Sequence, residues 1–440
     1  MAPIQRGGAV RRVNKVPFLF ALALAFGGGL PAAAPVDAAS VNSLALRATY
    51  DVTASFSWST RAVSVHTTAH VTNPTGGSVS TVAFNLATLH TGNANVGVVT
   101  VRGSAVSETI SDQTVLVPFS PPLGAGSSAD VVINYNATLA SKAGGYKWQF
   151  VRRGGVMTAY RWIPWLSRTA RFSNVGGGES YVTPSSTSVD VQITTDQPLV
   201  IAGSGRRTGP NGLTQTFEAH NVRDFNFSAA PDYQTASRVT RGTTITFFYR
   251  TLPQARVLDR AVDGFNLFSD KIGTYPEDFL NIAEVGPWYG MESPNLNWIP
   301  RDAGSLLDYM VVHEVAHEWF YSMVGNDQGL EPFADEAVAE FLGREIAGTW
   351  TSSKCPGGNL DRTIYTSPGD CYVAVVYYQG YKYLDAYRDH VGNADFYQGL
   401  RNYYVANKYG IGGTRKLLDA LDNAANYHPN HEARFPSLYP

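Results

Sequence analysis

The sequence has few charged residues and almost no cysteine. Only 16% of its 440 residues are charged, and 34 Lys and Arg nearly balance 36 Asp and Glu, for a formal net charge of -2. Proteins that bind nucleic acid or anionic membranes electrostatically carry a basic excess, so we expect no nucleic-acid partner. The two cysteines, Cys355 and Cys371, form no Cys-x-x-Cys pair, which disfavours a metal site built from them.

Apolar runs that could span a bilayer are also lacking. The stretch from Pro17 to Leu30 is apolar but too short. Basic residues precede it, and an Ala-rich stretch with the cleavage-like triplet Val36-Asp37-Ala38 follows, as in a secretory signal peptide. We therefore expect a signal peptide over residues 1–38, no transmembrane anchor, and a secreted protein, extracellular or periplasmic. Export favours a disulfide between Cys355 and Cys371, because exported proteins fold in an oxidising environment.

Two patterns divide the rest of the chain, and its length favours more than one domain. Residues 42–236 alternate polar and apolar residues with period two between clusters of Gly, Pro, Asn and Ser, which predicts an antiparallel all-β sandwich or saddle domain. Residues 238–440 mix the period-two pattern of strands with the spacing of apolar residues typical of helices. We expect a helix over Leu252–Lys271, a strand over Phe279–Val285, and mainly helices from Ser305 onward. The expected fold class is multidomain, with an all-β domain followed by an α+β domain.

One predicted helix, Ser305–Val324, is apolar on almost every side. It contains the run His313-Glu-Val-Ala-His317, in which the two histidines lie four residues apart and share one face. Two imidazoles one turn apart suit two corners of a tetrahedral zinc site, and Glu314 is placed to act as general base toward a metal-bound water. The alternative, polar residues on a helix surface, conflicts with the cost of burying three ionisable groups without a ligand.

A second predicted helix supplies a third ligand. Pro332 suits its first position, the helix continues to Ala347, and Gly348 ends it. The preceding loop reverses the chain, so Glu336 is expected to complete a His₂Glu site that holds a single Zn2+ per chain and leaves one position to water. Glu340, one turn later, has two interpretations: it accepts a hydrogen bond from a ligand imidazole, or it pairs with Arg344.

The spacing of these residues resembles the motif of a known family. His313-Glu-Val-Ala-His317 with Glu336 matches the H-E-x-x-H-x18-E pattern of the gluzincins and is similar in particular to the aminopeptidase N family. That family has a G-x-M-E-N loop upstream, which Gly290-Met291-Glu292-Ser293 resembles. It also has a Tyr-x-Lys-Gly segment after the third ligand, which Tyr377-Tyr378-Gln379-Gly380 resembles.

The resemblance implies a fold and a set of roles. It implies a saddle-like N-terminal domain followed by a thermolysin-like zinc peptidase domain that acts on peptides. Glu292, with Gly290 and Met291, would bind the free α-amine of the substrate. Tyr377 would donate its hydroxyl to the oxyanion, with Tyr381 as the next candidate in a tyrosine-rich segment.

The sequence also departs from the family pattern. Ser293 and Asp335 each replace an Asn, Gln379 replaces a Lys, and the long helical C-terminal domain is missing, which would leave the cleft more open. Two further functions therefore stay open beside an aminopeptidase. One is a zinc endopeptidase; the other is a catalytically inactive binding module, against which the intact ligands and Glu314 argue. Nothing in the sequence indicates the oligomeric state.

Overall fold

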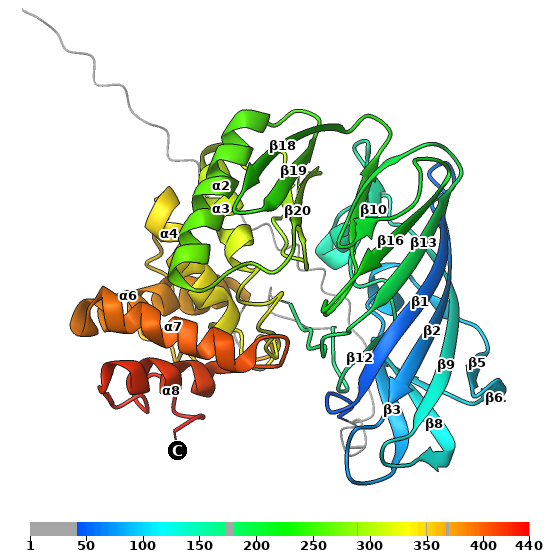
Figure 1. Ribbon diagram of the computed structural model, residues 1–440, viewed down its shortest axis with the longest axis horizontal. Helices are drawn as coiled ribbons and strands as arrows, with labels where there is room; N and C mark the ends of the chain where they lie inside the picture. Colours follow the sequence, from blue (N-terminus) through cyan, green and yellow to red (C-terminus); the bar gives the residue numbers. More distant parts are fainter. Residues whose placement is uncertain (1–41, 173–178, 288, 349, 367–368, 440) are drawn as a thin grey trace, which may run out of the picture. The chain divides into compact units, whose positions relative to one another are not determined.

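The structure, a computed structural model, describes residues 42–172, 179–287, 289–348, 350–366 and 369–439. The signal peptide expected over residues 1–38 lies outside these ranges. Within them, a β-rich region precedes a region of mixed strands and helices (Figure 1), so the expected fold class is confirmed. Among the described residues, no helix combines the length and the apolar character that crossing a membrane requires.

The largest sheet follows from the alternating segments of the sequence. Every second side chain of β1 (Arg47–Phe56) is buried, beginning at Ala48, as period-two alternation predicts. The strand order is β15-β16-β13-β1-β2-β9-β5-β6, and β4 also pairs with β9. The pairs β1–β2 and β2–β9 are antiparallel as expected, whereas β1 and β13 run parallel. The other strands are β2 (Ala62–Thr72), β4 (Asn95–Val96), β5 (Val99–Val101), β6 (Ser104–Val106), β9 (Ser128–Thr138), β13 (Val189–Thr195), β15 (Arg206–Arg207) and β16 (Thr214–Ala219).

Two four-stranded sheets complete the β-rich region, in the orders β10-β11-β17-β14 and β12-β3-β8-β7. Their apolar side chains share one hydrophobic core with the largest sheet, in which the rings of Phe56 and Phe227 lie 4.8 Å apart. The strands are β3 (Val79–Asn85), β7 (Thr109–Ser111), β8 (Thr114–Leu123), β10 (Phe150–Arg153), β11 (Val156–Ala159), β12 (Trp165–Leu166), β14 (Val200–Gly203) and β17 (Phe227–Ala230). Two short helical turns are α1 (Thr88–Thr91) and η1 (Gly145–Gln149).

A fourth sheet begins the α+β region, in the order β18-β19-β20-β21. Helix α2 (Gln254–Lys271) contacts β18 and β19 (Figure 1) and buries Phe265 and Phe268. The predicted division into residues 42–236 and 238–440 falls inside β18, which pairs with β19, and this division stays a prediction. The strands are β18 (Gln234–Thr240), β19 (Thr243–Tyr249), β20 (Phe279–Val285) and β21 (Leu296–Pro300).

Helices that follow the fourth sheet carry the candidate site. Successive contacts join α3 to α4, α4 to α6, α6 to α7 and α7 to α8 (Figure 1). The predicted disulfide between Cys355 and Cys371 is confirmed. The helical segments are η2 (Gly304–Leu306), α3 (Leu307–Ala316), η3 (Phe333–Ala337), α4 (Val338–Ala347), α5 (Gly369–Tyr372), η4 (Val373–Gln379), α6 (Gly380–Val391), α7 (Asn393–Asn407) and α8 (Thr414–Ala425).

Helix α3 is shorter than the sequence predicts. The expectation of one helix over Ser305–Val324 is wrong beyond Ala316, where α3 ends. The backbone N–H of Ser322 bonds the carbonyl five residues before it, and Tyr321 has a φ of 142°. The Tyr321 hydroxyl donates to Asp224 of the β-rich region, at 2.7 Å. This contact, between residues far apart in the chain, overrides the local preference for helix.

Candidate metal centre

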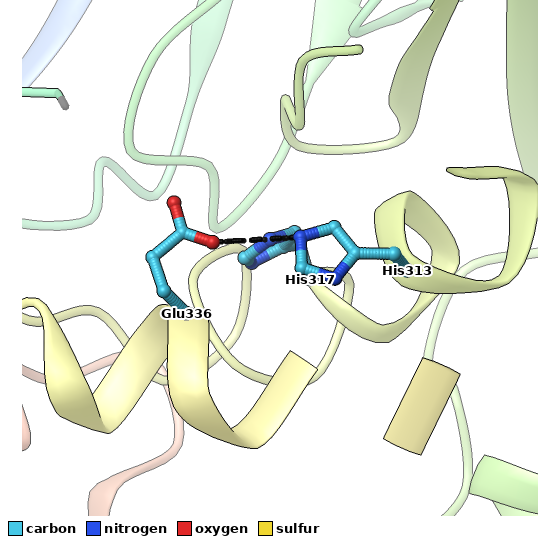
Figure 2. Close-up of side chains that lie close together, drawn as sticks. All are labelled: His313, His317 and Glu336. Atoms are coloured by element: carbon cyan, nitrogen blue, oxygen red, sulfur yellow. Dashed lines mark hydrogen bonds and ion pairs between the residues drawn. The ribbon is translucent and has the colours of Figure 1, made fainter. Parts of the chain in front are cut away.

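Three side chains from two helical segments converge at one buried point (Figure 2). His313 lies in the last turn of α3 and His317 follows its end, so their Nε2 atoms lie 3.2 Å apart. Glu336 extends from η3, and its Oε2 lies 3.4 Å from His313 Nε2 and 3.5 Å from His317 Nε2. At most 7% of any of these side chains is exposed.

The spacing of these three atoms fits a tetrahedral ion. A zinc ion bonded at about 2.0–2.2 Å separates neighbouring ligand atoms by about 3.3–3.6 Å, close to the three distances observed. Within the described part of the chain, Glu336 Oε2 is buried and makes no hydrogen bond, although the two ring nitrogens lie 3.4 and 3.5 Å away. A buried carboxylate oxygen without a proper donor is costly, and a cation at this point removes that cost. The residues present therefore fit zinc.

The far side of each imidazole is held by its own partner. His317 Nδ1 lies 2.7 Å from Asp335 Oδ1 and 3.1 Å from the carbonyl of Phe320, both of which only accept hydrogen bonds. Nδ1 must therefore carry the proton, which leaves the Nε2 lone pair directed at the cluster. His313 Nδ1 lies 3.4 Å from the hydroxyl of Tyr309, four residues earlier on the same face of α3.

Buried carboxylates make the centre attractive to positive charge. Glu292, Glu314, Asp335 and Glu336 are each at least 94% buried. Burial lowers the pKa of His317, but Asp335 and Glu336 outweigh burial and raise it overall. Burial likewise raises the pKa of Glu336, yet its contacts with the two histidines lower it overall. The same field that would hold a proton on His317 favours a divalent ion.

Glu314 lies beside the three-atom centre. It forms a second cluster with Glu292 and His317, whose ligand atoms lie within 4.8 Å of one another. Burial, opposed by His317 and reinforced by Glu292, raises the pKa of Glu314 well above its usual range, the direction that a general base working near neutral pH needs. A Cβ at position 290 would overlap Glu314 Oε1, so Gly290 is the residue that lets the upstream loop pass this close.

Glu292 is presented by a loop that β21 holds in place. Met291 and Trp298 exchange both backbone hydrogen bonds, at 2.9 and 3.2 Å, and the Met291 side chain is buried in a core that includes Trp298. Glu292 is 4% exposed, and its Oε1 accepts a hydrogen bond of 2.8 Å from Gln328. Burial, opposed by His317, raises the pKa of Glu292 to about 8. Met291 thus anchors the loop, while Glu292 faces the cluster.

The structure separates the two tyrosine candidates. The Tyr377 ring stacks on that of His313, with centroids 5.8 Å apart and planes 16° apart. Burial and the nearby Glu336 carboxylate raise its pKa well above the usual range, so its hydroxyl keeps its proton. Tyr381 instead lies against Arg344, and its hydroxyl bonds Asp385. Tyr377 is therefore the candidate that lies at the centre.

Glu340 pairs mainly with Arg344, one of its two expected roles. Arg344 Nε donates to Glu340 Oε1 at 2.6 Å, and the Tyr309 hydroxyl donates to Glu340 Oε2. Glu340 Oε2 lies 3.8 Å from His313 Nδ1, too far for a hydrogen bond. Glu340 thus reaches the histidine through Tyr309. The same-face spacing of Tyr309 and His313 was a signal that the sequence offered for this contact.

Three residues at the centre were missed from the sequence. Asp335 was noted only as a departure from the family, yet it holds His317; its position next to Glu336 was the available signal. Gln328 bonds both Glu292 and Asp335, and no motif marks it. Burial raises the pKa of Glu179 well above its usual range, and the carboxylates of Glu292 and Glu336 raise it further, so this carboxyl of the β-rich region interacts electrostatically with the centre.

Two departures from the family pattern have structural partners. Ser293 Oγ lies 2.9 Å from Ser204 Oγ and accepts a hydrogen bond of 2.7 Å from Asn226, so it ties the Glu292 loop to the β-rich region. Gln379 donates to the carbonyl of Cys355 at 2.6 Å, next to the disulfide. Neither side chain is bonded to the histidine ligands or to Glu336.

Comparisons with known proteins give matches in structure alone. No family model and no curated protein sequence matches the chain. An M1 zinc metallopeptidase from Deinococcus radiodurans is 19% identical with a TM-score of 0.69, over 89% of this chain and 93% of that one. A mutant of that enzyme bound to a Tyr-Ser-Ala substrate gives 0.66 at 19% identity, over 88% and 93%. Native yeast LTA4 hydrolase gives 0.65 at 17% identity, over 90% and 69%. At these identities the likeness establishes a shared fold.

Proposed function

We propose that the chain is a zinc-dependent peptidase whose ion is held by His313, His317 and Glu336. The observation that carries this proposal is the convergence of three buried acceptor atoms 3.2–3.5 Å apart. Each histidine presents Nε2 to the same point, and the buried Glu336 Oε2 makes no hydrogen bond to any described residue. The shared fold with M1 zinc metallopeptidases supports the choice of metal and of reaction.

Two side chains beside the metal ligands would carry out the chemistry. A bound zinc ion would polarise the scissile carbonyl and lower the pKa of a coordinated water to about 7. Glu314 takes the proton of the attacking water and passes it to the leaving amine; its raised pKa suits both transfers. Tyr377, whose raised pKa keeps its hydroxyl protonated, donates a hydrogen bond to the oxyanion as it forms.

We further propose that the enzyme is an aminopeptidase. Glu292 accepts the free ammonium of the substrate, because a second buried carboxyl group lies within 4.8 Å of Glu314 and His317, and an ammonium beside it would favour its ionised form. Gly290 gives this loop room beside Glu314. A mutant of the Deinococcus radiodurans enzyme has been solved with a Tyr-Ser-Ala substrate, and a mutant of a two-domain M1 zinc metallopeptidase has been solved with L-arginine; both ligands carry a free amine.

We also propose that the protein is exported and has two domains. We place a signal peptide at residues 1–38 and the protein outside the cell or in the periplasm, with which the Cys355–Cys371 disulfide is consistent. Residues 42–236 and 238–440 are proposed as the two domains of the mature protein.

Paired substrates test the proposal. The purified protein, with its zinc content measured, is assayed on a tripeptide with a free amine and on its N-acetylated form. We expect hydrolysis of the free peptide and at least about a hundredfold lower kcat/KM for the blocked one, because the ion pair with Glu292 is lost. Equal rates would indicate an endopeptidase, and a zinc-loaded protein that cleaves neither peptide would contradict the enzymatic proposal.

A further inference from the structure

One buried amide joins the two carboxylates on either side of the candidate centre. Gln328 lies in the loop between α3 and η3 and is 3% exposed. Its Nε2 donates to Glu292 Oε1 at 2.8 Å and to Asp335 Oδ2 at 3.0 Å. The other oxygen of Asp335 holds His317 Nδ1. A single nitrogen therefore connects the carboxylate proposed to bind the substrate amine with the carboxylate that orients a metal ligand.

The direction of this amide is fixed by the β-rich region. Arg161 Nη2 faces Gln328 Oε1 at 3.4 Å, and a guanidinium can only donate. An ionised carboxylate can only accept, so with Glu292 and Asp335 ionised both face the NH₂ group. Arg161 is itself held by Asp224, at 3.0 Å, and by the Tyr321 hydroxyl, at 2.6 Å. The amide thus has one orientation that satisfies all its neighbours.

Gln is the side chain whose chemistry fits this position. Asn is one methylene shorter and would not reach both carboxylates, and Glu would add a negative charge to an already acidic cluster. Met has a similar size but no donor. Because Glu292 is 4% exposed and Asp335 is 1% exposed, water cannot readily replace a lost hydrogen bond at either one.

We propose that Gln328 is a positioning residue that holds Glu292 and Asp335 at a fixed separation, and so sets both the selectivity for a free amine and the hold on the metal through His317. The proposed effect on selectivity rests on the proposed aminopeptidase function. The proposed effect on metal binding rests only on the candidate zinc site. Arg161, in the β-rich region, contributes to this positioning because it fixes the orientation of the Gln328 amide.

The matched variants are Gln328→Met and Gln215→Met. Gln215 is also buried, 1% exposed, and its amide donates to the carbonyl of Leu199 in the β-rich region. Each variant loses one buried amide, so general destabilisation affects both. Kinetics on the free and N-acetylated tripeptide give kcat and KM separately, and the rate of zinc release to a chelator is a second measurement that does not depend on turnover.

We expect Gln328→Met to raise KM for the free peptide roughly tenfold to a hundredfold, with a smaller change in kcat and little change for the blocked peptide. Zinc release should be about tenfold or more faster. Gln215→Met should leave the selectivity and the zinc release rate at the parental values. In a Glu292→Ala background, Gln328→Met should reduce selectivity no further, because it acts through Glu292.

Two results would overturn the inference. One is a ratio of kcat/KM for the free peptide to that for the blocked peptide that, in Gln328→Met, stays within about twofold of the ratio in an unmutated protein that is selective. The other is an unchanged rate of zinc release. If the unmutated protein does not prefer the free-amine peptide, the proposed aminopeptidase function is refuted. The rate of zinc release would then still test the effect of Gln328 on metal binding. If Gln328→Met does not fold, Gln328→Asn is tested instead, because it keeps the amide on a side chain too short to reach both carboxylates. Its selectivity and its rate of zinc release are judged in the same way.

Discussion

Asp335 Oδ1 lies 2.7 Å from His317 Nδ1, while the next residue, Glu336, brings its Oε2 to within 3.5 Å of Nε2 on the same ring. Two consecutive carboxylates thus contact opposite edges of one imidazole. Asp335 fixes the proton of His317 on Nδ1. Glu336 Oε2 lies at the proposed metal position, which the unprotonated Nε2 of His317 also faces. His317 is therefore the ligand whose removal should disturb the centre most.

His317→Ala should lose the metal. The variant removes one ligand and leaves Asp335 Oδ1 without its histidine partner, so we expect less than about one tenth of an equivalent of zinc after dialysis, measured by elemental analysis. The control is His70→Ala, which removes a surface histidine that bonds Asp51 and Asp130 and should keep full zinc. Stoichiometric zinc in the His317 variant would show that the ion is bound elsewhere.

Glu314→Ala should separate chemistry from metal binding. Glu314 belongs to the cluster with Glu292 and His317 but is not one of the three proposed ligands, so the variant should keep the fold and the zinc. We expect kcat to fall by about 10²–10⁴-fold or more, because the general base is gone. Turnover at the parental rate, with zinc still present, would refute the role of Glu314.

Tyr377→Phe should lower kcat by about 10²-fold or more, since one donor to the oxyanion is removed while the ring that stacks on His313 is kept. Tyr381→Phe is the matched control, because its hydroxyl bonds Asp385 away from the centre. The ranking of the two tyrosines proposed here fails if the Tyr381 variant is the slower enzyme.

The ligands could be predicted from the sequence because they depend on local geometry. His313 and His317 are one helical turn apart, and Glu336 lies in the helical segment that follows α3 in the chain. The strands β1 and β20 were likewise predictable from period and composition. The end of α3 at Ala316 was not, because it depends on a contact between Tyr321 and the distant Asp224.

The contacts around the ligands could not be predicted for the same reason. Arg161 and Gln328 are separated by 167 positions in the sequence, and no periodicity relates them. Gln328 contacts Glu292, 36 positions earlier, only because the loop before η3 lies beside the loop before β21. One sequence contains no signal for pairs of this kind; they follow from the folded arrangement.

Glu284 should make stability depend on pH in the acid range. It is 1% exposed, and its carboxylate accepts hydrogen bonds from the backbone N–H groups of Arg250, Thr251 and Leu252 and from the Thr251 hydroxyl. Burial raises its pKa, but these donors outweigh burial and lower it overall. Because the folded pKa lies below the unfolded value of about 4.3, the stabilisation is complete above that value and is lost as pH falls through the folded pKa.

Glu284→Gln should therefore reduce the free energy of unfolding by about 1–2 kcal/mol at pH 7, with a smaller difference near pH 3. Urea unfolding at both pH values measures this. Glu218→Gln, an exposed carboxylate on β16, is the control and should change little at either pH. A Glu284 variant whose deficit grows as the pH falls would contradict the assigned direction of the shift.

Zinc titration into the metal-free protein tests whether one ion at the three-ligand site supports peptide hydrolysis. Hydrolysis of a free-amine peptide is measured as zinc is returned in fractions of an equivalent to protein stripped by a chelator. We expect no activity without metal, a linear rise in activity as zinc is added, and saturation at about one equivalent per chain, the capacity of a single three-ligand site. Activity that survives complete removal of the metal, or a protein that binds one equivalent and still cleaves no peptide, would contradict this expectation.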